Sequence, residues 1–116
     1  MSMAVLYHNP RCSKSRAALA LLTERDLDLE VVRYLETPPD EASLRKLLDQ
    51  LGMTPLELMR RGEARYRELG LKGADISDHD RIRAMAENPI LIERPIFVTN
   101  GRAVVGRPPE RVLELL

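Results

Sequence analysis

Cys12 is the most reactive candidate in this sequence, because a cysteine thiolate is a strong nucleophile. The chain has no second cysteine. It follows an apolar run that ends at His8-Asn9-Pro10, and an amphipathic stretch comes after it. This position predicts a strand-to-helix turn, where unpaired amide groups and the helix dipole stabilise an anion. Arg11, Lys14 and Arg16 add positive charge nearby, and we place His8 on the same loop. We therefore expect a lowered pKa for the thiol.

The alternative is an inert cysteine packed in the core, since free cysteine often behaves as a small hydrophobic residue. The polar and charged neighbours of Cys12 argue against that reading. Three positions later stands Ser15, so the motif is Cys-x-x-Ser and the chain lacks a resolving thiol. Any redox cycle then needs an outside thiol such as glutathione. We expect the Ser15 hydroxyl to donate to the thiolate, to cap the first helical turn, or both.

Three arginines are candidate ligands for an oxyanion substrate, because guanidinium groups bind tetrahedral oxyanions through paired hydrogen bonds. Arg94 precedes a predicted strand and Arg107 follows one, so both stand at element ends, where sites usually lie. Arg60 is predicted on a short helix beside Arg61. Taken singly, each arginine is more often simple surface charge.

The hydrophobic pattern predicts the elements that position these residues. Met3–Tyr7 and Leu29–Tyr34 are predicted strands, and Ser13–Arg25 between them is a predicted helix. A strand–helix–strand unit of this kind implies parallel strands. Ile96–Thr99 and Ala103–Val105 are further strands, joined by the hairpin signal Asn100-Gly101 and followed by a helix opened by Pro108-Pro109-Glu110.

Helices fill the middle of the sequence. One is capped by Asp40 and ended by Gly52, a second is Leu56–Arg61, a third is Glu63–Leu69, and a last one starts at Ser77 and stops before Pro89. The predicted fold class is α/β: a thioredoxin-like fold with a small mixed sheet, in the order βαβ then ββα, flanked by helices. We expect one domain over residues 1–116, with a helical insertion at about residues 40–88 between the second and third strands.

Composition excludes several functional classes. Eighteen basic and eighteen acidic side chains give no net charge, which disfavours general binding to nucleic acid or membranes. The sequence has neither a bilayer-spanning apolar run nor a signal-peptide pattern at its start, and its lone cysteine suits a reducing cytoplasm. One cysteine and two distant histidines show no metal-ligand spacing.

Five segments together resemble the glutaredoxin-coupled arsenate reductases of bacteria, in particular the short arsenate reductase-like members. The segments are Tyr7–Arg16, Tyr34–Pro39, Leu58–Arg60, Asn88–Ile96 and Gly106–Pro109, and the likeness covers essentially the whole chain. The resemblance implies a thioredoxin-like fold with a helical insertion and a cis peptide bond at Arg94-Pro95.

The resemblance also implies an activity. The Cys12 thiolate would attack arsenate to form a thiol–arsenic adduct, glutathione would join it as external reductant, and glutaredoxin would remove the resulting mixed disulfide. Arg60, Arg94 and Arg107 would hold the oxyanion, while His8 and Ser15 would tune or orient the sulfur. No bound cofactor is implied, and we expect a monomer.

Two other functions remain open at this stage. The same fold serves in redox-responsive regulators that bind RNA polymerase, although these commonly sense oxidation through Cys-x-x-Cys, which Ser15 interrupts here. The chain could also be a generic glutathione-linked thiol protein with no oxyanion substrate. Binding of arsenate, phosphate or sulfate would discriminate, because only the first reading requires an anion site.

Overall fold

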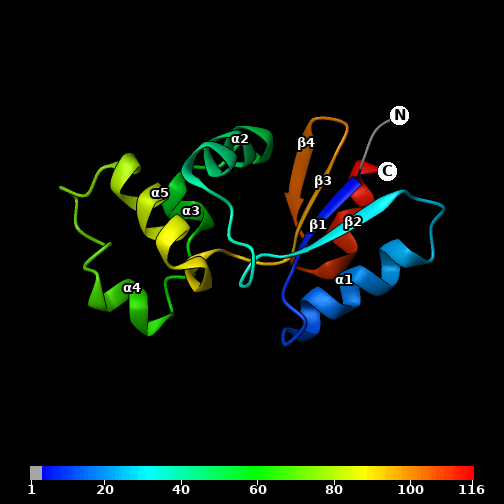
Figure 1. The fold of residues 1–116 in the computed structure, drawn as a ribbon, viewed down its shortest axis with the longest axis horizontal. Helices are drawn as coiled ribbons and strands as arrows, with labels where there is room; N and C mark the ends of the chain where they lie inside the picture. Colours follow the sequence, from blue (N-terminus) through cyan, green and yellow to red (C-terminus); the bar gives the residue numbers. More distant parts are fainter. Residues whose placement is uncertain (1–3) are drawn as a thin grey trace. The chain divides into compact units, whose positions relative to one another are not determined.

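The computed structural model describes residues 4–116, and the chain forms two compact units (Figure 1). The sheet unit takes in the described chain up to Thr37 and from Arg94 onward, and the helical unit is Pro38–Glu93. The helical unit is thus inserted between the second and third strands, as predicted. That the two units make up one domain stays a prediction.

The sheet unit contains four strands in the order β2-β1-β3-β4. β1 (Ala4–His8) runs parallel to β2 (Leu29–Arg33), which confirms the predicted strand–helix–strand unit. β3 (Ile96–Thr99) is antiparallel to β1, and β4 (Arg102–Val105) is antiparallel to β3. The first strand was predicted from Met3, which lies outside the described residues. The order of elements is that of the predicted thioredoxin-like fold.

The core of the sheet unit lies between the sheet and two helical segments, α1 (Ser13–Thr23) and η2 (Pro109–Leu115) (Figure 1). Leu6 and Phe97 face each other on neighbouring strands and are fully buried. Ala18 and Leu22 of α1 and Val112 of η2 close the same cluster. The predicted terminal helix is therefore present, but as a 3-10 helix.

The hairpin between β3 and β4 forms where Asn100-Gly101 predicted it. Both residues have positive φ, 54° and 75°, which the tight two-residue turn requires and which asparagine and glycine tolerate best. The predicted cis peptide bond at Arg94-Pro95 is present, and a second one at Arg107-Pro108 was not predicted.

The helical unit contains α2 (Glu41–Leu51), α3 (Pro55–Leu58), α4 (Ala64–Glu68), α5 (Asp78–Glu87) and the 3-10 segment η1 (Pro89–Leu91). Local signals set most of these limits. The Asp40 carboxylate accepts the Ser43 amide at 2.8 Å, Gly52 ends α2 with φ 67°, and Ser77 caps α5. The predicted helix Leu56–Arg61 is wrong at its end, because the chain leaves the helix at Met59, which forms an isolated bridge with Ile92.

Across residues 4–116, none of the helices has the length and apolar character that crossing a bilayer requires.

Candidate active site

Cys12 occupies the N-cap position of α1, so it lies at the predicted strand-to-helix turn. Its backbone is extended, its amide donates to the Asn9 carbonyl at 3.0 Å, and its carbonyl accepts the Arg16 amide at 3.0 Å. These bonds fix a tight loop between β1 and α1. The side chain is half-buried and in no disulfide. A sulfur held in this way at a helix start is accessible and close to backbone donors.

The surroundings of Cys12 favour the thiolate. Partial burial by itself raises the pKa of the thiol, but the Ser15 amide, the charge of Arg94, the Lys14 amide and the Arg107 guanidinium outweigh it, so the pKa lies below its ordinary value. The side chain closes no capping hydrogen bond of regular geometry. The two amides therefore act on the sulfur as nearby dipoles rather than as a formal cap.

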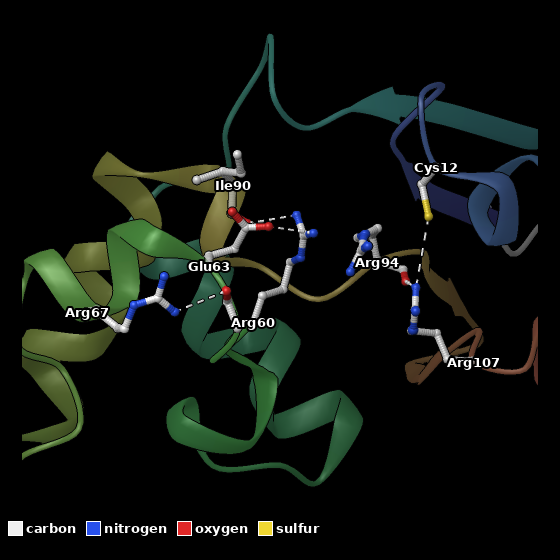
Figure 2. A network of polar contacts seen from close by, with 8 residues as sticks. Cys12, Arg60, Glu63, Arg67, Ile90, Arg94 and Arg107 are labelled. Carbon is white, nitrogen blue, oxygen red and sulfur yellow. Dashed lines mark hydrogen bonds and ion pairs between the residues drawn. The ribbon is translucent and has the colours of Figure 1, made fainter.

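Two arginines of the sheet unit act on the sulfur (Figure 2). Nη1 of Arg107 donates toward Sγ of Cys12 at 3.9 Å, a long contact, and toward the Arg94 carbonyl at 3.3 Å. Arg94 acts on the same sulfur through its charge. Both residues were selected from sequence, although they follow Cys12 by more than 80 positions. A thiolate beside two guanidinium groups can attack an electrophile that carries negative charge.

The Ser15 hydroxyl is engaged on the other side of the loop. Its Oγ lies 2.7 Å from Nδ1 of His8 and accepts the Asn9 amide at 3.0 Å, and the residue is fully buried. From the sequence we expected the hydroxyl to donate to the thiolate, to cap the first helical turn, or both. In the structure, the group of Ser15 that lowers the thiol pKa is its backbone amide. Ser15 thus ties the end of β1 to the first turn of α1.

His8 is the last residue of β1 and does not lie on the loop where we expected it, and its side chain is 4% exposed. Burial lowers the pKa of its ring, and the positive charges of Arg33 and Arg16 lower it further. Because free histidine already titrates near 6.5, this ring is neutral at pH 7. His8 therefore orients Ser15 and does not serve as a cation beside the thiolate.

Arg60 belongs to the helical unit and is not on a helix, contrary to the prediction. Its guanidinium pairs with the Glu63 carboxylate at 2.6 Å and donates to the Ile90 carbonyl at 3.2 Å (Figure 2). Its amide donates to the Leu91 carbonyl at 2.8 Å. These contacts fix the loop after α3. A role for Arg60 in binding an oxyanion stays a prediction.

Sequence reasoning missed two arginines. Arg33, at the end of β2, is paired in register with His8 at the end of β1. The predicted parallel pairing could have indicated this position, because the carboxyl ends of parallel neighbours meet at one edge of the sheet.

The second missed residue, Arg81 of α5, is 8% exposed and donates to the carbonyls of Leu71, Gly73 and Ile76. Nothing local distinguishes it from the other arginines of its helix.

No group of three or more histidine, cysteine, aspartate or glutamate side chains in the described chain is arranged to hold a metal ion.

Comparison with known proteins identifies close relatives. The sequence profile of the ArsC family matches residues 7–115. The uncharacterized protein YfgD of Escherichia coli (strain K12) is 56% identical over 112 residues, which is 96% of this chain and 94% of that protein. An arsenate reductase of Neisseria meningitidis (serogroup A) is 47% identical over 112 residues, 96% of each chain. The structure of an arsenate reductase from Vibrio cholerae aligns with a TM-score of 0.95 at 50% identity and covers 98% of each chain.

Proposed function

The chain belongs to the ArsC family, and from this premise we propose that it is an enzyme, an arsenate reductase that uses the Cys12 thiolate as nucleophile. The proposal is supported by the arsenate reductases of Neisseria meningitidis and Vibrio cholerae, which match nearly the whole chain. The observation that carries it is the half-buried sulfur whose pKa is lowered by two amides and two guanidinium groups. Such a thiolate is both nucleophilic and placed to receive an anion.

In the first step, the sulfur of Cys12 attacks arsenic and a sulfur–arsenic bond forms. One arsenate oxygen leaves as water after it takes up protons. Arg107 and Arg94 stabilise the negative oxygens through charge-assisted hydrogen bonds. Arg60 is the third proposed ligand, and it would have to exchange its contact with Glu63 for the substrate.

In the second step, glutathione supplies the thiol that the chain lacks, since its sequence contains one cysteine. The glutathione sulfur bonds to arsenic and displaces a second oxygen as water. The two sulfurs then couple as a mixed disulfide, so that together they lose two electrons while As(V) gains two. The As(III) that leaves takes up one water and is released as arsenite, so that the cycle loses one water in total. Glutaredoxin, with further glutathione, reduces the mixed disulfide and restores the Cys12 thiolate.

This cycle needs no bound cofactor, and it suits a monomer in a reducing cytoplasm. His8 and Ser15 have positioning roles in the proposal. The hydrogen bond between them holds the first turn of α1 against β1, which keeps the amide of Ser15 directed at the sulfur.

A coupled assay tests the proposal: oxidation of NADPH through glutathione reductase, with glutathione, glutaredoxin and arsenate present. We expect arsenate-dependent turnover in the wild type and none above background in Cys12→Ser. Arg25→Gln removes an exposed charge from the loop after α1 and is the matched control with wild-type turnover. Turnover in Cys12→Ser would refute the mechanism. Glutathione exchange at Cys12 without arsenate reduction would favour a generic thiol protein instead.

A further inference from the structure

A pocket of about 210 Å³ lies in the sheet unit beside the loop that carries Cys12. One wall is the last residue of β1, His8, with the loop that follows it as far as Arg11. The other is the end of β2 with the turn after it, from which Arg33, Leu35 and Glu36 contribute. The two walls meet because β1 and β2 are parallel and His8 pairs in register with Arg33. None of the mechanistic steps above uses this pocket.

The lining carries opposite charges on exposed side chains. Arg33 and Glu36 stand at the two ends of a turn in which the amides of Glu36 and Thr37 both donate to the Arg33 carbonyl at 3.0 Å. Arg11 supplies a second cation from the facing wall, and Leu35 supplies an apolar surface that is 38% exposed. A ligand with a carboxylate for an arginine and an ammonium group for Glu36 would match these charges. An α-amino acid group carries both on one carbon atom.

The volume limits what the pocket can hold. Pockets that enclose a whole small ligand usually measure roughly 300–1,000 Å³, so a pocket of about 210 Å³ accommodates one end of a larger molecule. Glutathione has such an end. Its γ-glutamyl group carries a free α-carboxylate and a free α-ammonium, whereas its glycyl end carries a carboxylate alone.

The loop that leads into Cys12 also forms one wall of the pocket. Arg11 lines it and is the residue directly before Cys12, so their α-carbons are about 3.8 Å apart. The γ-linkage separates the α-amino acid group of glutathione from its cysteinyl residue by two methylenes and an amide. A ligand anchored by its γ-glutamyl end in the pocket can therefore extend its thiol along the loop toward Cys12.

We propose that this pocket is the subsite for the γ-glutamyl end of glutathione, with Arg33 binding the α-carboxylate and Glu36 the α-ammonium. The inference rests on the proposed function, in which glutathione is the second thiol. It assigns thiol selectivity to residues that do not contact the oxyanion.

Thiol–disulfide exchange at Cys12 tests the subsite without arsenate. The Cys12 thiolate attacks one sulfur of oxidised glutathione, a Cys12–glutathione disulfide forms, and one glutathione thiolate leaves. Mass spectrometry of the intact protein gives the rate constant. The comparison disulfides are hydroxyethyl disulfide, which has no charge, and those of γ-glutamylcysteine and cysteinylglycine, each of which keeps one end of glutathione.

We expect oxidised glutathione and the γ-glutamylcysteine disulfide to react at similar rates, and the cysteinylglycine disulfide about tenfold more slowly. Arg33→Gln should slow the first two about tenfold, as expected for the loss of one charge-assisted hydrogen bond. It should leave hydroxyethyl disulfide unchanged. Arg25→Gln is the remote control for the same change of charge.

Glu36→Gln distinguishes specific binding of the γ-glutamyl group from long-range electrostatic attraction of an anion. Oxidised glutathione is an anion, so removing a negative charge would speed its reaction if only long-range attraction mattered. The subsite requires the reverse, a slowing of about fivefold, because the ammonium loses its partner. Faster exchange in Glu36→Gln, or equal effects of Arg33→Gln on charged and uncharged disulfides, would overturn the proposal.

Different results would refute the proposed arsenate reductase activity and the proposed glutathione subsite. Selective exchange with no arsenate reduction would refute the reductase and leave the subsite standing. Arsenate reduction with unselective exchange would refute the subsite and leave the reductase standing.

Discussion

Arginine side chains do different work in the two units of this protein. In the helical unit, Arg81 and Arg60 direct their guanidinium groups at backbone carbonyls, and Arg60 also pairs with a carboxylate. In the sheet unit, Arg107 contacts the sulfur of Cys12 and Arg94 acts on it through its charge. Through their bonds to carbonyls, Arg81 and Arg60 stabilise the backbone of the helical unit. Arg107 also donates to the Arg94 carbonyl, but it and Arg94 differ from Arg60 and Arg81 in acting on a nucleophilic sulfur.

Among the variants that test this difference between the two units, we expect Arg107→Gln to have the largest effect. We expect kcat/KM for arsenate to fall by about two to three orders of magnitude, the usual loss when one donor to a charged transition state is removed. Coupled turnover measures the loss. Arg102→Gln on β4 removes an exposed charge from the same unit and should retain full turnover. Turnover in Arg107→Gln within threefold of wild type would show that Arg107 is not needed.

The corresponding change in the helical unit is Arg81→Met, which keeps much of the side-chain volume. Three carbonyls lose the guanidinium as a donor, although the Gly73 carbonyl keeps the Ile76 amide, and we expect the free energy of unfolding to fall by about 2–3 kcal/mol. Urea denaturation measures it. The exposed neighbour Arg83→Met should change stability by less than about 0.5 kcal/mol. Equal effects of the two variants would contradict the structural role of Arg81.

Ser15→Ala tests whether the hydroxyl or the backbone amide of Ser15 lowers the Cys12 pKa. Its hydroxyl is buried between His8 and the Asn9 amide, so we expect a loss of about 1–2 kcal/mol in unfolding free energy. The Cys12 pKa should scarcely move, because the amide remains. The exposed Ser13→Ala is the control. A clear rise of the Cys12 pKa in Ser15→Ala alone would return the hydroxyl to the role that the sequence suggested.

The smallest expected effect is a shift in the pH dependence of Cys12 alkylation, which compares one arginine of each unit. The lowered pKa means that the thiolate persists to lower pH than in free cysteine, so the midpoint of iodoacetamide reaction should lie below about 8.5. The same shift stabilises the folded state as pH rises above the folded pKa, and that contribution is lost as pH falls through it. Arg107→Gln should move the midpoint upward and Arg81→Met should not. A midpoint at or above 8.5 in the wild type would contradict an activated thiolate.

Much of the fold could be predicted because its signals are local. The Asp40 and Ser77 caps, the end of α2 at Gly52 and the Asn100-Gly101 turn each depend on residues within a few positions. The limits of α3 could not be predicted in this way. The helix begins at Pro55, within one residue of the predicted start, but its end is set by the pairing of Met59 with a residue more than 30 positions away.

By itself, the sequence determined that Cys12 stands at the start of a helix, that the first two strands are parallel, and that no second cysteine can resolve a disulfide. Propensity, spacing and composition suffice for such statements. Only the tertiary structure decided that Arg107 reaches the sulfur, that the Ser15 hydroxyl turns to His8, and that Arg33 closes a pocket. Side-chain direction across distant segments depends on packing and burial, which neighbours in sequence do not encode.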